Sequence, residues 1–485
     1  MKVPEPKNLR SYDQNQSMLF PPNLKEFIEE NDLCWVIDDV VNALDLSCLY
    51  RNVSSEGNMP YHPKMMLKVL FYAYASGIFS SRKIAKALGE NVAFIFLAAW
   101  QRPDFRTISY FRKNNLEAIR DLFGQIVFLC QELNMVKLGH ISIDGSKFKA
   151  NAADRRSYDQ KRIDKEIKSI LDQAEQADHE EDALYGPDST GDELPDEIRS
   201  RKKRLERLKQ IQKELTDRGK KRVNATDPDA AFMKTKAGLK TSYNAQACVD
   251  DHCQVIIAAS VTDQPGDDAQ LIPMLDQATK NTKGDIGIVT ADAGYGNASN
   301  LEAIEPYKVD AYIPDDTYQS RQRGKAVGAF DKDSFIYDPS QDVFICPEGN
   351  PLTYWHRRHL KKKGEYLVYR CKVCNQCQHF GRCTKSKAGR SIWRRQVDEK
   401  VKAMREKLDT EAGKELYAKR KHIIEPVFGQ VKAAMGFTGF LLRGLNKVDP
   451  EFLIVTIAHN LRKITTYCYQ RGVGIVPRPD PKATT

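Results

Sequence analysis

Three acidic residues, Asp144, Asp292 and Glu425, have the types and settings needed for phosphodiester chemistry. Asp144 and Asp292 each end a short apolar pattern typical of a strand, and Gly145 follows the first acid directly. Mg²⁺ prefers oxygen ligands and binds one or two protein carboxylates together with water and phosphate oxygens. Two such ions, about 3.5–4 Å apart, stabilise both the attacking and the leaving oxygen of an in-line displacement. The set therefore predicts cleavage by two Mg²⁺ or Mn²⁺ ions held by these three carboxylates.

The third acid lies in a predicted helix that is rich in cations. Tyr417 and Arg420 precede Glu425, and Lys432 follows it by seven residues, close to two helical turns. Such a helix suits a phosphate-chain substrate, because the acid can bind metal while Arg and Lys bind the backbone. Pro426 should bend or restart the helix at this point. The alternative is a surface helix with ordinary salt bridges.

The first part of the chain is predicted to be helical. Apolar residues at helical spacing indicate a helix over His62–Ala75, and Ser80 and Ser81 cap a short basic helix, Arg82–Leu88. A further helix is expected from an N-cap at Thr107 to about Leu133. Two short helices with a basic second start resemble a helix-turn-helix, the alternative being a bundle with a solvated basic face. The predicted DNA contacts are Arg82, Lys83, Arg106 and Arg112.

The patterns that follow indicate an α/β core, because strands alternate with amphipathic helices. A strand over residues 138–149 precedes a charged helical hairpin over 160–222, whose acidic middle, Asp178–Glu197, looks like a loop. The later elements are strands Tyr243–Val249, Gln254–Val261, Ile286–Thr290 and Val309–Ile313, helices Asp267–Asn281 and Ser299–Tyr307, and a long helix over 397–436.

Composition sets the broad class. A chain of 485 residues with 41% hydrophobic and 29% charged residues predicts a globular protein of two to four domains. The net charge of +10 becomes informative where the basic residues cluster. The N-terminus has no apolar signal segment, and the longest apolar run, Val92–Trp100, is far shorter than the roughly 20 residues of a membrane span. We therefore expect no membrane association and a reducing, cytoplasmic location.

Five of the 11 cysteines fall in one short basic region. Cys371, Cys374 and Cys377 form a C-x₂-C-x₂-C run, with Cys346 upstream and Cys383 downstream. Paired C-x₂-C spacings are typical of tetrahedral Zn²⁺ sites, although five thiols compete for four places. A zinc-stapled basic insertion suits contact with a DNA backbone, and the alternative is a reduced loop without metal.

These motifs resemble a bacterial insertion-sequence transposase of the RNase H-like DDE class, in the branch with a Tyr-Arg-Glu-Lys helix and closest to the insertion-sequence-1182 family. Ile143-Asp144-Gly-Ser resembles the first acidic motif and Thr290-Ala-Asp292-Ala-Gly-Tyr the second. The segment Tyr417–Lys432 resembles the third, and Arg443-Gly-Leu an element after it. One departure is that Arg420 precedes Glu425 by five residues, where the broader superfamily often has four.

The resemblance implies a fold and a division into domains. The fold is an RNase H-like mixed-sheet catalytic core with a helical N-terminal domain, a helical insertion and a zinc-ribbon-like insertion. The DNA-binding domain would span 1–137 and the core 138–150, 241–319 and 397–470. The helical insertion would span 151–240, the cysteine-rich insertion 320–396 and a tail 471–485. The resemblance also favours Cys346, Cys374, Cys377 and Cys383 as ligands of one structural Zn²⁺.

The resemblance further implies the function. The protein would bind the terminal inverted repeats of an insertion sequence as a homodimer on double-stranded DNA, near the bacterial nucleoid. It would cut the ends and join them to target DNA, with Tyr417, Arg420 and Lys432 on the phosphate of the transferred end and Arg443 as a further DNA contact. The alternatives are a catalytically retired, sequence-specific DNA-binding protein and a structure-selective nuclease without strand transfer.

Overall fold

The structure is a computed structural model that describes residues 23–51, 59–185, 196–323, 328–360, 364–395 and 398–472. The chain divides into two compact units, one of Met1–Asn115 with Ile464–Thr485 and one of Leu116–Lys463. The N-terminal segment of the first unit therefore ends 22 residues before the predicted domain boundary at residue 137. The predicted tail lies outside the described residues from residue 473 on. Within the described part of the chain, no helix is long and apolar enough to cross a membrane.

The first unit is helical, as predicted. The long helix expected from Thr107 to Leu133 is wrong in two respects. Asp104 is the N-cap, because its carboxylate accepts from the Thr107 backbone N–H at 2.7 Å. The segment is also two helices, which meet at Asn115. The α-helices of the first unit's N-terminal segment are α1 (Leu33–Ala43), α2 (Ser47–Tyr50), α3 (Pro63–Ala75), α4 (Ser81–Glu90), α5 (Val92–Leu97) and α6 (Phe105–Asn114). Helix α7 (Leu116–Glu132) follows in the second unit.

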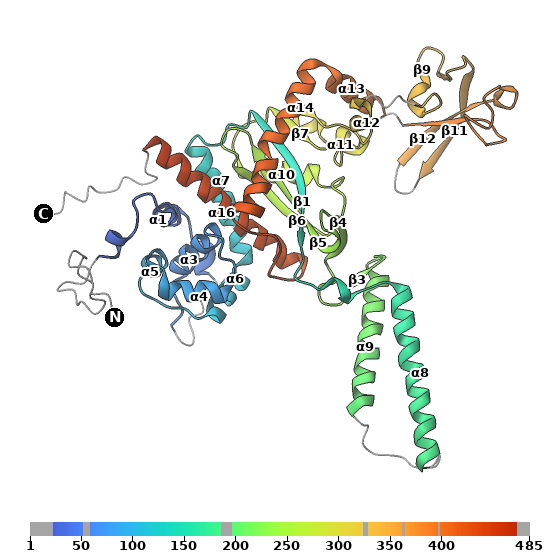
Figure 1. Cartoon of the computed structure of the whole chain (residues 1–485). Coiled ribbons are helices and arrows are strands. Elements are labelled where there is room, and N and C mark those ends of the chain that lie inside the picture. The colour runs from blue at the N-terminus through green and yellow to red at the C-terminus, as the bar shows by residue number, and fades with distance from the viewer. Residues whose placement is uncertain are drawn as a thin grey trace, which may run out of the picture. The chain divides into compact units, whose positions relative to one another are not determined.

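The second unit is built on a six-stranded mixed sheet (Figure 1). The strand order is β4-β5-β1-β7-β8, and β6 pairs with β5 beside β4. β1 is antiparallel to β5 and parallel to β7, which is parallel to β8. This arrangement confirms the predicted mixed α/β core. The strands are β1 (His140–Lys149), β4 (Ala231–Thr235), β5 (Gly238–Asp250), β6 (Ile256–Thr262), β7 (Ile288–Ala291) and β8 (Asp310–Tyr312).

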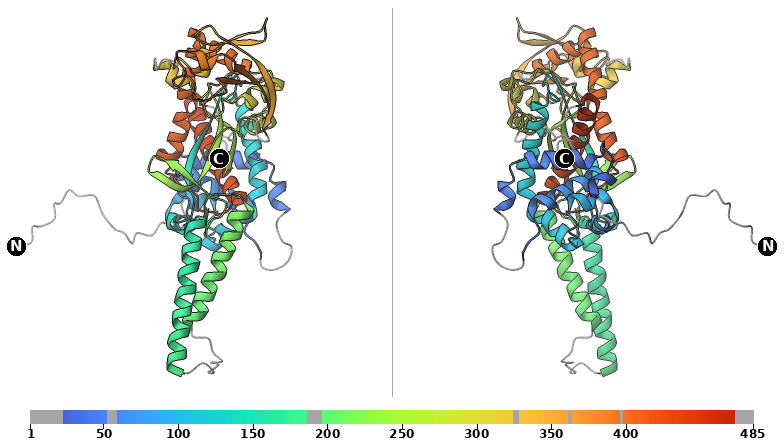
Figure 2. Two further views of the ribbon diagram at one scale, coloured as in Figure 1. Left: turned by 90° about the vertical axis from the view of Figure 1, so that its right-hand side faces the viewer. Right: turned by 90° about the vertical axis from the view of Figure 1, so that its left-hand side faces the viewer.

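A helical hairpin interrupts the sheet after β1. Helices α8 (Gln160–Tyr185) and α9 (Asp196–Asp217) lie side by side in Figures 1 and 2, and the short strands β2 (Ser157–Tyr158) and β3 (Val223–Asn224) pair at its base. The prediction of a loop over Asp178–Glu197 is wrong at both ends, because α8 continues to Tyr185 and α9 begins at Asp196. Residues 186–195 lie outside the described part of the chain. The insertion is also shorter than 151–240, because β4 and the start of β5 belong to the core sheet.

The C-terminal part of the chain covers the sheet in several segments rather than one long helix. Helices α13 (Asp398–Asp409), α14 (Glu411–Ile423) and α15 (Glu425–Gly429) are followed by a π-helical turn, Gln430–Ala434, and by α16 (Leu445–Arg471). The prediction of a continuous helix over 397–436 is therefore wrong. The Phe148 side chain of β1 packs against four aromatic rings from this segment, Phe428, Phe437, Phe440 and Phe452.

Side chains of α16 complete the hydrogen bonds of β6. Asn460 donates to the Ile256 carbonyl at 2.8 Å and accepts from the Ile256 N–H at 2.9 Å. Asp449 accepts from the Val261 N–H at 2.6 Å. Unpaired backbone groups at a sheet edge are costly to bury, so these polar side chains let an apolar helix cover the strand. Remaining helices of the core are α10 (Leu271–Asn281), α11 (Ala298–Ala303) and α12 (Tyr318–Gln322).

The cysteine-rich region forms its own five-stranded antiparallel sheet, in the order β13-β12-β11-β10-β9. Its small core contains Phe335, Phe344, Leu352, Tyr369 and Ile392, together with Cys371. The region thus folds around apolar side chains within the stretch predicted as a separate insertion. Its strands are β9 (Ile336–Asp338), β10 (Val343–Ile345), β11 (Pro351–Leu360), β12 (Gly364–Cys371) and β13 (Ser391–Arg394).

Candidate active site

The parallel pairing of β1 and β7 places Asp144 beside Asp292. Ile143 is paired with Ala291; Asp144 is the next residue of β1, and Asp292 is the first residue after β7. Asp144 lies inside β1 and not at its end as expected, because the antiparallel pairing with β5 continues to Lys149. The parallel pairing stops just before the two acids, so their side chains share one level of the sheet. Each carboxylate accepts a 2.8 Å hydrogen bond from a glycine N–H, that of Gly145 or Gly294.

Two acids this close disfavour each other's charged form. Burial, followed by the negative charge of Asp292, raises the pKa of Asp144 to about 6, although Arg420 and the Gly145 N–H act in the opposite direction. Burial and the charge of Asp267 raise the pKa of Asp292. The site therefore carries excess negative charge near neutral pH that a bound cation would relieve.

The raised pKa of Asp144 predicts a pH-dependent stability. A proton binds Asp144 more tightly in the native than in the unfolded protein, so this stabilisation is complete below pH 4 and is lost as pH rises through about 6. In EDTA, we expect the free energy of unfolding of wild type to fall relative to Asp144→Asn between pH 4 and 7. The loss should reach about 3 kcal/mol, because a difference of one in pKa corresponds to about 1.4 kcal/mol. Denaturant titrations at each pH measure it, and a pH-independent difference would contradict it.

Arg420 connects the third acid to the other two. Its Nη1 lies 3.0 Å from Asp144 Oδ2 and its Nη2 lies 3.7 Å from Glu425 Oε1. Residues five apart on a continuous helix would point about 140° apart. Here the helix breaks at Ile424 and restarts with Pro426 in the first turn of α15, which brings the Glu425 carboxylate back to Arg420. The restart predicted at Pro426 is present, and it explains why a spacing of five is compatible with this contact.

Lys432 and Tyr417 are held near the same place. Lys432 Nζ donates to Ser146 Oγ at 2.6 Å and to the Lys147 carbonyl at 3.1 Å. Because side chains alternate along a strand, Ser146 shares a face of β1 with Asp144. The Tyr417 ring lies 5.8 Å from the Arg420 guanidinium, on the preceding turn of α14. The three predicted phosphate contacts thus surround the acids.

Arg443, the further predicted DNA contact, is exposed and donates to the Asn151 carbonyl at 2.8 Å.

A hydrogen-bonded network under Gly145 was not expected from the sequence. Asp267 Oδ1 accepts from Asn244 Nδ2 at 2.6 Å and from Gln246 Nε2 at 2.7 Å, and Lys147 Nζ lies 3.4 Å away. Asp267 was predicted to begin a helix, but it lies in the loop before α10. The only signal in the sequence was a pair of adjacent acids, Asp267 and Asp268, in a Pro-Gly-Asp-Asp turn.

Gly145 is needed for space rather than for backbone freedom, since it is not among the residues with positive φ. A Cβ at this position would lie 2.5 Å from Asp267 Oδ1 and 2.8 Å from Asn244 Oδ1. We expect Gly145→Ala to destabilise the protein by about 1–3 kcal/mol, as overpacking does. Gly139→Ala, with no atom within 4 Å of its Cβ, is the matched control. Equal thermal midpoints for the two variants would contradict this explanation.

The predicted DNA contacts of the first unit separate into two groups. Arg82 of α4 and Arg106 of α6 are exposed and stack over one ring, Phe105, at 4.9 and 5.7 Å. Lys83 is exposed next to Arg82. Arg112 is different: it is only 5% exposed and donates to the Tyr74 hydroxyl at 2.8 Å. Its guanidinium supports the packing of the helices, so the placement does not favour the predicted DNA contact.

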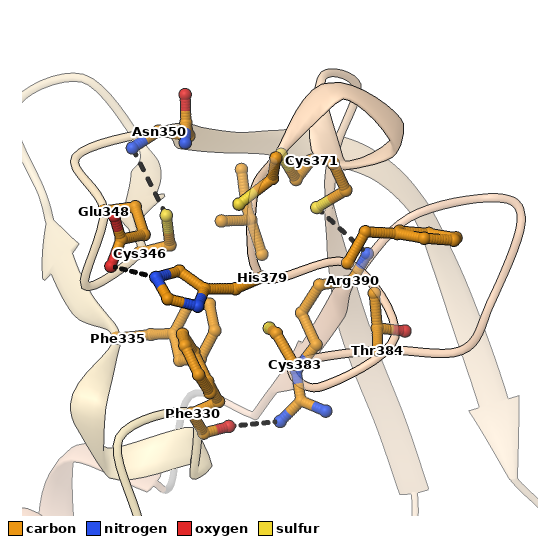
Figure 3. A pocket seen from close by; sticks show the side chains of 14 residues that line it. Phe330, Phe335, Cys346, Glu348, Asn350, Cys371, His379, Cys383, Thr384 and Arg390 are labelled. Carbon is orange, nitrogen blue, oxygen red and sulfur yellow. Dashed lines mark hydrogen bonds and ion pairs between the residues drawn. The ribbon is translucent and has the colours of Figure 1, made fainter.

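The five clustered cysteines line a single cavity of about 20 Å³, room for one ion or water (Figure 3). Two of them already accept hydrogen bonds from backbone N–H groups at 3.3 Å: Cys346 from Asn350 and Cys374 from Arg390. Cys371 is 2% exposed and packs within the apolar core, and burial with its neighbour Cys374 raises the pKa of its thiol to about 11. In the described residues, no group of three or more His, Cys, Asp or Glu side chains meets the geometry of a metal site.

Two family models match separate parts of the chain. A family model described as a transposase DDE domain matches residues 345–465, and a second, described as a transposase domain, matches residues 22–114. These matches indicate an insertion-sequence transposase of the DDE class. The first match includes Arg420, Glu425 and the cysteines of the cavity, whereas Asp144 and Asp292 lie outside both.

Two other comparisons add little to the transposase matches. No curated protein matches the chain. A cryo-EM structure of a piggyBac transposase synaptic complex with hairpin DNA aligns with 92% of this chain and 76% of its own, at 10% identity and a TM-score of 0.32.

Proposed function

We propose that this DDE transposase cuts the ends of its insertion sequence and joins them to target DNA, using a site built from Asp144, Asp292 and Glu425. The observation that carries the proposal is the Arg420 guanidinium, which bridges Asp144 and Glu425 while Asp292 lies at the level of Asp144 on the next strand. Asp144 and Glu425, 281 positions apart in the sequence, thus both contact one guanidinium. A catalyst of phosphodiester chemistry requires carboxylates and positive charge close together.

The donor chemistry of this site fits a divalent metal. Asp144 and Asp292 offer partly buried carboxylates, and the charge of Asp292 raises the pKa of Asp144, a cost that a bound cation would relieve. The Glu425 side chain, 53% exposed, can be reached from solvent. Carboxylate oxygens are the ligands that Mg²⁺ and Mn²⁺ favour. When bound, two such ions would activate the attacking oxygen and stabilise the leaving oxygen of the cut strand.

The neighbouring cations would hold the DNA. The Arg420 guanidinium, which contacts Asp144 and Glu425, would bind a phosphate oxygen beside these acids. Burial lowers the pKa of Lys432, and its ammonium lies on the same face of β1 as Asp144. A phosphate placed between Arg420 and Lys432 would present its phosphorus to the two aspartates. Arg82, Lys83, Arg106 and Arg443 remain exposed for contacts with the duplex.

We further propose that Cys346, Cys374, Cys377 and Cys383 bind one structural Zn²⁺, with Cys371 as a packing residue. The backbone N–H bonds to Cys346 and Cys374 support this choice, because they stabilise thiolate sulfur, the form that binds zinc. Cys371 lies in the apolar core instead. The site would keep the insertion folded around a core too small to be stable alone.

We propose that the substrate is double-stranded DNA, that the protein is a homodimer on the paired ends, and that it is associated with the bacterial nucleoid. A pre-cut end fragment with a free 3′-OH, incubated with the protein, plasmid and Mg²⁺, tests the chemistry. We expect joined products from this fragment and none from a fragment ending in a dideoxynucleotide, which lacks the attacking hydroxyl. Cleavage of uncut ends without any joining would favour a nuclease, and specific binding without cleavage would favour a retired DNA-binding relative.

A further inference from the structure

The turn that carries Asp292 is anchored by a buried tyrosine. Tyr295 is 0% exposed, and its backbone N–H donates to the Asp292 carbonyl at 3.1 Å. Between these two residues, the Gly294 N–H donates to the Asp292 carboxylate at 2.8 Å. The direction of this carboxylate therefore depends on where the core holds the Tyr295 side chain.

The Tyr295 hydroxyl is held by a side chain of β5. It donates to the Oε1 atom of Gln246, a residue that is itself 0% exposed. The other end of this amide is also bonded, because Gln246 Nε2 donates to Asp267 Oδ1 at 2.7 Å. Turning the amide by 180° would place its oxygen against the Asp267 carboxylate, where both groups are acceptors. Gln246 therefore has one orientation, and Asp267 sets it.

Asp267 is in turn fixed in place by its neighbours. Asn244, two residues before Gln246 on β5, donates to Asp267 Oδ1 at 2.6 Å and to the Gln264 carbonyl at 3.2 Å. Lys147 Nζ of β1 lies 3.4 Å from the same carboxylate, whose side chain is 16% exposed. The acceptor that orients Gln246 is thus held against two strands of the sheet.

A second bridge joins the same two segments of the chain. Asn300 of α11, which is 7% exposed, donates to the Asp268 carbonyl at 2.7 Å and to the Tyr295 carbonyl at 2.9 Å. One amide thus connects the backbone next to Asp267 with the backbone of Tyr295. Because one bridge acts on the hydroxyl of Tyr295 and the other on its carbonyl, together they restrict both the ring and the main chain.

Asp267 also lies against the two glycines that follow the acids. A Cβ on Gly145 would lie 2.5 Å from Asp267 Oδ1, and a Cβ on Gly294 would lie 3.4 Å from Asp267 Oδ2. Gly145 and Gly294 are the residues whose N–H groups donate to Asp144 and Asp292. One oxygen of Asp267 therefore faces each of the two backbone segments that position the acids.

We propose that Gln246 is a positioning residue for Asp292: oriented by Asp267, it holds the Tyr295 hydroxyl and thereby the direction of the Asp292 carboxylate. The inference rests on the proposed function, in which Asp292 is a ligand of a divalent metal. Groups behind the ligands of a metal orient them, and their loss typically costs 10–100-fold in metal affinity. In this role Gln246 and Tyr295 touch neither metal nor DNA and act only through Asp292.

Binding of Mn²⁺ to the full-length protein without DNA, measured from the EPR signal of free Mn²⁺, tests the proposal. The ions to count are those that Asp292→Asn no longer binds. We expect Tyr295→Phe, which removes only the hydroxyl, to weaken their binding about tenfold. Tyr243→Phe is the matched control, because Tyr243 is also 0% exposed and donates to Asp227 Oδ1 at 2.8 Å. It should lose comparable stability in thermal unfolding and bind Mn²⁺ as wild type does.

A double variant tests whether the three groups act as one chain. Gln246→Met removes both hydrogen bonds of the amide, so adding Tyr295→Phe should cause no further loss of Mn²⁺ affinity. Additive losses would overturn the proposal, as would wild-type affinity in Tyr295→Phe or an equal loss in Tyr243→Phe. If wild type binds no Mn²⁺ that Asp292→Asn abolishes, the metal site and this inference are both wrong. The expected Mn²⁺ results in a protein that never cuts DNA would refute the proposed function alone.

Discussion

Asp292→Asn is expected to lower the rate of DNA strand cleavage at least about 10³-fold, because it removes one carboxylate from the site proposed to hold two metal ions. The variant should also be more stable than wild type in EDTA. Burial and the charge of Asp267 raise the pKa of Asp292, so the neutral amide relieves a cost that the native fold carries. Loss of activity with a gain of stability distinguishes a functional carboxylate from a structural one.

The control for this experiment is Asp285→Asn. Asp285 is an exposed acid that precedes the same strand, β7, and it should be replaceable without effect on either quantity. Cleavage of a labelled element end measures the rate, and thermal unfolding with and without Mg²⁺ measures the stability. Mg²⁺ should raise the midpoint of wild type more than that of Asp292→Asn, because only the former offers the complete set of ligands. Cleavage by the variant within tenfold of wild type would contradict the assignment.

Cys374→Ser should have the largest effect on stability. Structural zinc sites are worth about 10–16 kcal/mol of binding free energy at neutral pH, and the small core of the insertion cannot replace it. We expect the variant to lose its zinc and its cysteine-rich region to become sensitive to proteases. Cys371→Ser is the matched variant: it changes a buried core thiol, so it should keep one zinc per chain while lowering the stability by about 1–3 kcal/mol.

Elemental analysis and limited proteolysis of the purified proteins measure both effects. The trypsin sites to follow are the many Lys and Arg residues between 357 and 395. If Cys371→Ser loses the metal and Cys374→Ser keeps it, the ligand set is wrong by one residue. Absence of zinc from wild type purified without chelators would remove the proposed site altogether.

Local sequence patterns predicted much of this fold because their causes are local. The apolar alternation around Ile141 and Ile143 marks β1, and the stripes of Ile163, Ile170, Leu208 and Ile211 mark the buried face of the hairpin. Asp292 follows β7 directly, as its setting predicts. These features depend on residues within one or two turns or strands.

Features set by distant partners were predicted incorrectly. Asp144 is inside β1 because β5, about 100 residues later, extends the pairing beyond it. The break at Ile424 combines a local signal, Pro426, with the tertiary contact that turns Glu425 towards Arg420. Asp267 lies in a loop whose sequence suggested a helix, and its role depends on amide groups of β5. A spacing rule cannot anticipate contacts that only the assembled sheet creates.

The packing of Phe148 bears on how the protein is made. Its ring is buried by side chains between Phe428 and Phe452, and Arg420 and Glu425 lie on the same late segment. A ribosome delivers β1 long before these residues, so a nascent chain contains both aspartates while the cover of β1 is still missing. The complete set of acids can form only after nearly the whole chain has emerged. Under the proposed function, an unfinished polypeptide would therefore lack the third acid and could not cut DNA before its synthesis is nearly complete.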